Sequence, residues 1–301
     1  MKTNSIIICL AILVSTATSF ADTSYDILKL IGPRYEKTKQ HEYNLEFQTG
    51  YALKNESTPG YYYGNEETKM SLNAIRVYMA YGITNELQCH LDVPMVYIKE
   101  ERTSYEDKSG SGLGDASAGF AFKRNMNEGL MVLDLTYTTP NGSSPFEVNT
   151  NDELPTGNGF HSLKPEIAFF KFIGPAVLYG IGNIQYSLPE DNLSQLRNGP
   201  EGSYSVLKKV TPGHVIGLNL GTAVDFNKAF AANWGLAFRQ YAKNKYNWQS
   251  GTRNTGKEIT TAYFYAGAIM TMNNYTFFPK LTIGTTDDSY DFGFSIRLPL
   301  L

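Results

Sequence analysis

The C-terminal stretch, residues 290–301, constrains the fold of this chain most strongly. Successive side chains of a β-strand point to opposite faces, so a strict alternation gives a strand with one apolar and one polar face. An apolar face either covers a protein core or contacts lipid in an outer-membrane barrel. The apolar positions are Tyr290, Phe292, Phe294, Ile296, Leu298 and Leu300, and Asp291, Gly293, Ser295, Arg297 and Pro299 lie between them.

The same alternation recurs along the chain. Segments of about 10 residues carry it, which is the length of a tilted strand that crosses a bilayer. We expect about twelve strands, because short turns alternate with long polar segments as they do in outer-membrane barrels. We expect the long segments to be loops, at residues 54–69, 99–114, 140–161, 187–212 and 244–257.

The pattern therefore predicts an all-β fold, a transmembrane antiparallel up-and-down β-barrel over residues 41–301. In lipid only a closed barrel leaves no strand edge unpaired. No segment after residue 21 has the roughly 18 consecutive apolar residues of a membrane-spanning helix. The barrel would contact outer-membrane lipid in a Gram-negative-type envelope.

Residues 1–21 have the pattern of a cleaved signal peptide, which predicts export to the cell outer membrane. Lys2 is the positive n-region, residues 6–14 are the apolar core, and residues 19–21 fit the small-x-small cleavage rule. Removal of Lys2 changes the formal charge from -3 to -4. A mildly acidic mature chain argues against nucleic acid as a partner.

Residues 22–40 form a short segment between the signal peptide and the barrel. Residues 25–31 can form a helical turn, which Gly32 and Pro33 would end. The segment is expected either to lie in the periplasm as a lead-in or to plug the lumen.

A glycine-rich motif, Gly112-Leu113-Gly114-Asp115, precedes one of the alternating segments. Its spacing differs from that of phosphate-binding loops, and no helical pattern follows it. The motif resembles a hallmark of the phenol-degradation meta-pathway (MetA-like) family of outer-membrane barrels. This resemblance implies a barrel fold and a transport function. Other segments that resemble this family are residues 81–87, 91–94, 138–142 and 173–180.

The last strand also resembles the C-terminal signal that is read by the barrel-insertion machinery, which implies this machinery as a partner. The residues that carry this resemblance are Asp291, Gly293, Ile296 and Leu298.

Many positions on the polar faces of the expected strands are charged, and these positions would face the lumen. Barrels of eight strands are filled by side chains and those of sixteen hold an aqueous channel, so an intermediate barrel allows an ion-pair network or a solute path. The candidates are Glu46, Arg76, His90, Asp92, Lys123, Asp134, Lys164, Glu166, Arg239, Lys280 and Arg297.

The histidines do not predict catalysis. His161 and Ser162 are the one adjacent His–Ser pair, and neighbours on a strand point to opposite faces. No nucleophile, base and orienting residue come together in the sequence. The other histidines, His41, His90 and His214, are too scattered to indicate a metal site. We expect no enzyme, no cofactor and no metal.

The predicted function is an outer-membrane channel for passive passage of small molecules, hydrophobic or aromatic ones among them. Two alternatives stay open. The barrel could bind a partner through its extracellular loops without transport, or it could be an export pore for short polypeptides.

Overall fold

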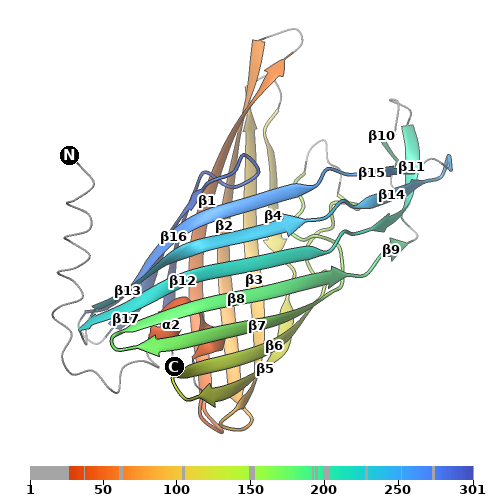
Figure 1. Cartoon of the computed structure of the whole chain (residues 1–301). Coiled ribbons are helices and arrows are strands. Elements are labelled where there is room, and N and C mark those ends of the chain that lie inside the picture. The colour runs from red at the N-terminus through yellow and green to blue at the C-terminus, as the bar shows by residue number, and fades with distance from the viewer. Residues whose placement is uncertain are drawn as a thin grey trace.

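Most of the described chain belongs to antiparallel strands that wind into a barrel (Figure 1). A computed structural model describes residues 27–300 except 37, 61–63, 104–105, 149–152, 192, 194–195, 199–203, 228–229, 252 and 273–274. The expected signal peptide lies outside these residues, as do residues 22–26. None of the helices within the described ranges is both long and apolar enough to span a membrane.

Twelve antiparallel strands close the barrel, which confirms the predicted fold. The first and last strands complete the ring, with Phe47 opposite Leu298 and Leu53 opposite Phe292. The barrel strands are β1 (Tyr43–Gly60), β2 (Gly64–Gly82), β3 (Leu87–Arg102), β5 (Ser117–Met126), β6 (Gly129–Thr138), β7 (Ser162–Ile173), β8 (Ala176–Ser187), β12 (Val215–Asn227), β13 (Phe230–Tyr241), β16 (Ile259–Met272), β17 (Tyr275–Gly284) and β18 (Phe292–Pro299).

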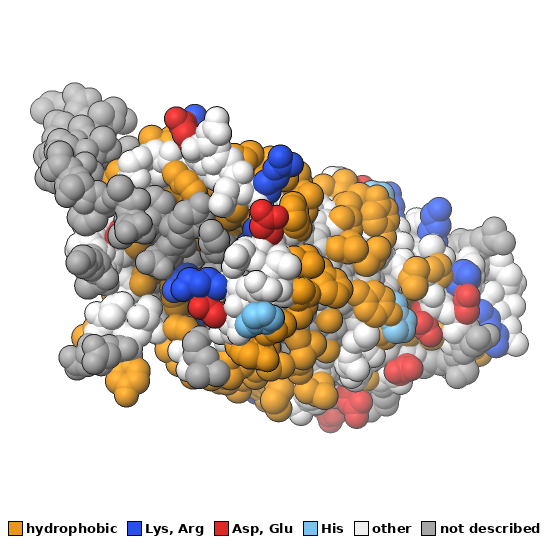
Figure 2. Space-filling view, turned by 90° about the horizontal axis from the view of Figure 1, so that it is seen from below, with side chains coloured by type: hydrophobic (Ala, Val, Ile, Leu, Met, Phe, Trp, Pro, Cys, Tyr) orange, Lys and Arg blue, Asp and Glu red, His pale blue; other side chains and the backbone are white. Residues whose placement is uncertain are grey.

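Apolar side chains cover the outer wall of the barrel. On β6, Leu133 and Leu135 are 42% and 47% exposed, whereas the alternate residues Val132 and Asp134 are 1% and 4% exposed. Figure 2 shows apolar side chains across the middle of this wall, with charged side chains towards its ends. An apolar belt on a closed barrel matches the surface that lipid requires.

Several segments that were expected to be loops contain strands. The β1–β2 pairing continues without interruption from Tyr43 and Tyr81 to Gly60 and Gly64, so most of residues 54–69 is strand. Cross-strand backbone hydrogen bonds extend this hairpin beyond the belt. In the expected loop 99–114, β4 (Lys108–Leu113) pairs with β3.

Two other expected loops, residues 187–212 and 244–257, form a smaller sheet beyond the barrel rim (Figure 1). Its strands bury apolar residues against the connection between β6 and β7, and these contacts hold the sheet together. The strands are β9 (Glu190–Asp191), β10 (Leu196–Asn198), β11 (Tyr204–Thr211), β14 (Lys245–Trp248) and β15 (Arg253–Thr255). We call Phe146, Phe160, Leu193, Leu207, Val210 and Trp248 the outer apolar cluster.

Residues 27–36, which precede β1, lie inside the barrel (Figure 1). It contains α2 (Ile27–Ile31) and the 3-10 turn η1 (Pro33–Tyr35). As the sequence predicted, α2 ends before Gly32 and Pro33. Residues 27–36 are called the N-terminal plug below. Residues 27–36, the described part of the segment expected to lie in the periplasm or in the lumen, pack against inward-facing residues of the barrel.

Candidate functional site

The N-terminal plug fills one end of the lumen through apolar packing. Ile27, Leu28 and Leu30 are almost completely buried among inward-facing residues of the barrel wall. The ring of Tyr35 packs against that of Phe170, with 5.2 Å between the centroids. This end is where short connections join the strands, at residues 83–86, 127–128 and 174–175. We call it the short-turn end, and the opposite end the long-loop end.

Two carboxylates lie side by side on the wall above the plug. Asp134 on β6 and Glu166 on β7 are directly paired across the strands. Like charges in this arrangement repel each other. Arg34 of the plug lies 3.6 Å from each of them, measured from Nη1 to Asp134 Oδ1 and to Glu166 Oε1. The plug therefore supplies the cation that this pair of acids requires.

Tyr35 adds a hydrogen bond to the same acid pair. Its hydroxyl donates to Glu166 Oε1 at 2.7 Å. Burial, followed by the charge of Glu166, raises the pKa of Tyr35 well above its ordinary value. The hydroxyl therefore keeps its proton and remains a donor to the carboxylate.

Asp134 also has partners on the wall. His90 Nε2 lies 2.7 Å from Asp134 Oδ2, and Thr136 donates to Asp134 Oδ1 at 2.5 Å. The ring of Tyr78 stacks on His90, with 5.9 Å between the centroids. Since all four side chains are buried, this cluster is a rigid support for Arg34.

Wall side chains also satisfy the backbone and the acid of the plug. Gln88 Nε2 donates to the Arg34 carbonyl at 3.1 Å. Lys123 donates to the Glu36 carbonyl and, at 2.6 Å, to Gln88 Oε1. Asn44 Nδ2 donates to Glu36 Oε2 at 2.7 Å. The plug is thus fixed by hydrogen bonds to several strands.

Arg297 on β18 fixes the other side of the plug. It forms an ion pair with Glu46 at 3.2 Å, donates to the Lys29 carbonyl and lies over the ring of Phe278. Lys280, on the neighbouring strand, lies 4.5 Å from the centroid of the Tyr265 ring.

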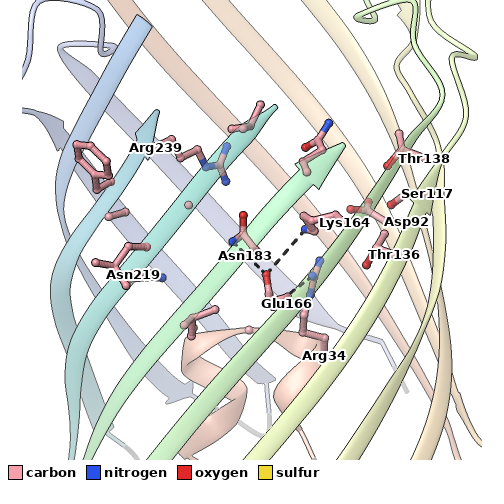
Figure 3. Close-up of a pocket in the computed structure, with 18 of the residues that line it drawn as sticks. Arg34, Asp92, Ser117, Thr136, Thr138, Lys164, Glu166, Asn183, Asn219 and Arg239 are labelled. Carbon is pink, nitrogen blue, oxygen red and sulfur yellow. Dashed lines mark hydrogen bonds and ion pairs between the residues drawn. The ribbon is translucent and has the colours of Figure 1, made fainter. Parts of the chain in front are cut away.

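A polar cavity of about 470 Å³ lies on the long-loop side of the plug (Figure 3). Its floor is made by Ile31, Gly32, Arg34 and Tyr35. Its wall carries Arg76, Asp92, Asp115, Ser117, Thr136, Thr138, Asn158, Lys164, Glu166, Ile181, Asn183, Gln185, Val215, Gly217, Leu218, Asn219, Ala237, Phe238, Arg239 and Tyr241.

Charged groups of the cavity wall interact within one strand and across neighbouring strands. Arg76 Nη2 lies 3.5 Å from Asp92 Oδ2. Glu166 Oε2 lies 3.9 Å from Lys164 Nζ and accepts a hydrogen bond of 3.4 Å from Asn183 (Figure 3). Arg239 on β13 lines the same cavity. In Figure 3, Asn183 lies between Arg239 and Lys164. The cavity therefore combines fixed charges of both signs with amide donors.

The charged candidates from the sequence divide into two groups. Those on the cavity wall are Arg76, Asp92, Lys164, Glu166 and Arg239. Those packed deeper, among the plug and its surrounding side chains, are Glu46, His90, Lys123, Asp134, Lys280 and Arg297.

Sequence reasoning missed Arg34, Tyr35 and the amides Asn183 and Asn219. The apolar turn of residues 27–31 was the one feature of the sequence that indicated a buried plug, because burial stabilises apolar side chains. Asn183 and Asn219 occupy inward positions, but uncharged side chains were not among the candidates.

The glycine-rich motif lies where the strand beside β3 is interrupted, between β4 and β5. Gly114 donates its N–H to the carbonyl of Pro94 at 2.8 Å. Asp115 accepts backbone hydrogen bonds from Gly142 at 3.2 Å and Asn158 at 2.8 Å. Gly112 and Leu113 belong to the end of β4. The motif thus anchors the β6–β7 connection to the rim of the cavity.

The residues of the expected insertion signal belong to the seam that closes the barrel. Asp291 accepts hydrogen bonds from the backbone and side chain of Asn55, at 2.8 and 3.0 Å. Gly293, Ile296 and Leu298 lie on β18, which pairs with β1.

His161 and Ser162 interact with different residues. The His161 ring stacks on Tyr137, and their side chains lie 2.7 Å apart. Ser162 is buried and accepts a hydrogen bond from Gln185 at 3.1 Å. Across the described ranges, no group of three or more His, Cys, Asp or Glu side chains is arranged to hold a metal.

Comparison with known proteins supports the fold. No protein-family model matches the chain. The chain is similar to a COG4313 outer membrane channel from Pseudomonas putida F1, with 14% identity and a TM-score of 0.66 over 87% of this chain and 96% of that chain. It is also similar to the translocator domain of the autotransporter NalP from Neisseria meningitidis, with 13% identity and a TM-score of 0.51 over 93% and 94% of the two chains. The chain has the fold of outer-membrane barrels.

Proposed function

We propose that this protein is an outer-membrane channel for passive passage of small molecules, with the N-terminal plug as its barrier. The observation that carries this proposal is the polar cavity of about 470 Å³ with the plug as its floor. In the described part of the chain, the plug joins no β-ladder. Side-chain contacts hold it instead, so it can be displaced without breaking the barrel.

We also propose where the protein is located and to which barrels it is related. The apolar belt supports a membrane location, and one similar solved structure is that of an outer membrane channel. We propose export through a cleaved signal peptide, insertion by the barrel-insertion machinery, and a distant relationship to the phenol-degradation meta-pathway barrels. Small hydrophobic or aromatic solutes were expected from the sequence, and the polar lining of the cavity supports solutes that also carry a polar group.

The test is single-channel conductance of the refolded mature protein in a planar bilayer. Three forms are compared: residues 22–301, a form without residues 22–36, and a control without residues 22–26. We expect the first form and the control to conduct weakly or intermittently and the form without the plug to conduct steadily. If all three forms are silent although heat-modifiable gel mobility shows folded barrels, the proposal is wrong.

A second candidate function is partner binding at the long-loop end. The observation that favours it is the small sheet with the outer apolar cluster, which gives the loops a defined shape. This function predicts that exchange of β11 and β14 for a short Gly-Ser connection removes a binding activity of whole cells and leaves conductance unchanged.

A further inference from the structure

Most acids of the lumen have a cationic partner within the protein. Glu46 pairs with Arg297, and Asp92 pairs with Arg76. Asp134 and Glu166 share Arg34. Asp115, at the cavity rim, accepts two backbone hydrogen bonds. Lys164 also lies 3.9 Å from Glu166. The four acids with cationic partners therefore contribute little free negative potential along the lumen, and Asp115 keeps its charge at the rim.

Two cations of the lumen, unlike most of these acids, have no partner of opposite charge among the described residues. In the part of the chain that the structure describes, neither Arg239 nor Lys280 has a carboxylate within ion-pair distance. Arg239 is exposed and lines the cavity, and Lys280 lies against Tyr265 deeper in the barrel. Both lie on the wall formed by β12 to β18. This wall therefore carries positive charge that the protein itself does not neutralise.

The surroundings of Arg239 are suited to a small anion. Gly217 is its direct neighbour across the strands, and Asn183 is the neighbour of Gly217. Because Gly217 has no side chain, the Asn183 amide can lie over this position, 2.6 Å from where a Cβ would stand, and so next to the residue that pairs with Arg239. Lys164 lies on the opposite side of Asn183 (Figure 3). A guanidinium can bind a carboxylate through two parallel hydrogen bonds.

Apolar side chains lie beside these donors. Ile31 of the plug, Ile181 and Ala237 line the same cavity as Arg239. A solute with a carboxylate and a short apolar body would place its charge at Arg239 and its body on these side chains. Removal of apolar surface from water would add to the attraction of the charges.

We propose that the channel is selective for small anions, with Arg239 as the residue that binds the carboxylate of a small organic acid. This inference rests on the proposed function and names its solute class. The formal charge of the whole chain is -3. Overall charge would therefore favour cations, so anion selectivity would have to come from the lumen.

The experiment measures the reversal potential of the channel in a tenfold potassium chloride gradient, and then in potassium acetate. We expect anions to be more permeant than potassium. Arg239→Gln should lower the anion-to-cation permeability ratio about threefold, because a unit charge near the aqueous path changes the local concentration of both ions. Arg239→Lys should keep most of the selectivity for chloride.

Lys69→Gln is the matched control. It also removes one positive charge, but Lys69 lies on the extended β2 hairpin, paired with Glu101 at 3.9 Å and away from the cavity. We expect no change of reversal potential in this variant. Heat-modifiable mobility is measured for every variant to show that the barrel is folded.

The outcomes separate the two proposals. A conducting channel that prefers potassium, or one in which Arg239→Gln leaves the reversal potential unchanged, would overturn anion selectivity and leave the channel function intact. A silent barrel would overturn the channel function alone. In that case acetate binding to the folded protein is measured by calorimetry, and binding that Arg239→Gln abolishes supports the anion site, whereas absent or unaltered binding overturns it.

Discussion

The two halves of the lumen use charged residues differently. In the half at the short-turn end, Arg34, Asp134 and Glu166 form a buried network that joins the plug to the wall. In the half at the long-loop end, Arg239 faces a cavity without a carboxylate partner among the described residues. The sequence allowed either an ion-pair network or an open lumen. The half at the short-turn end holds the ion-pair network, and we call it the packed half. The half at the long-loop end holds the cavity, and we call it the open half.

Substitution in the packed half should change the behaviour of the protein most. Arg34→Ala leaves Asp134 and Glu166 as adjacent carboxylates without their shared cation. Loss of one partner from a buried ion pair costs about 3 kcal/mol. We expect the plug to undock far more often, which single-channel recording would detect as a large increase in open time.

The control for Arg34→Ala is the double variant Arg34→Ala/Glu166→Gln. It removes the repulsion that the single variant exposes, so part of the closed time should return. Equal open times for the wild type and Arg34→Ala would show that the ion pairs do not hold the plug.

A smaller effect is expected from added volume, and it should differ between the halves. A Cβ at Gly119 would lie 2.5 Å from the Leu135 carbonyl oxygen and 2.7 Å from His90 Nε2. Overpacking of this kind costs about 1–3 kcal/mol. We expect Gly119→Ala to lower the free energy of unfolding, measured by urea titration of tryptophan fluorescence in lipid vesicles.

Gly217→Ala is the comparison in the open half. Its Cβ would meet the Asn183 amide at 2.6 Å, but this is the end of a flexible side chain beside a cavity. We expect a change close to zero in the free energy of unfolding. Equal destabilisation by both alanine variants would contradict the division into a packed and an open half.

The smallest effect is expected at the outer rim, where charges are exposed. The backbone N–H of Thr260 and then Lys257 lower the pKa of Asp288. A carboxyl group with a lowered pKa stabilises the fold above its ordinary pKa of about 3.9, and this contribution disappears as the pH falls through the lower value. Hydrogen exchange of the Thr260 amide should therefore be faster in Asp288→Asn at pH 7, and the difference should vanish near the folded-state pKa. Equal exchange at pH 7 would show that this hydrogen bond is absent in solution.

The wall of the barrel could be predicted from the local sequence pattern. Alternation with period 2 is a local property, so each strand shows which of its residues face lipid and which face inward. Leu133 and Asp134 could be assigned to opposite faces without knowledge of any neighbour. The loop assignments were less accurate, since residues 54–69 continue a hairpin that only the pairing partner stabilises.

Contacts between inward-facing residues could not be predicted from local pattern, because they depend on the fold of the whole chain. Tyr35 and Glu166 are 131 residues apart in the chain, and their hydrogen bond depends on the register of several strands and on the position of the plug. The short turn of residues 27–31 has no local preference for lumen or solvent. Its position follows from apolar burial and from acids on the wall that need a cation, and these exist together only after the barrel has closed.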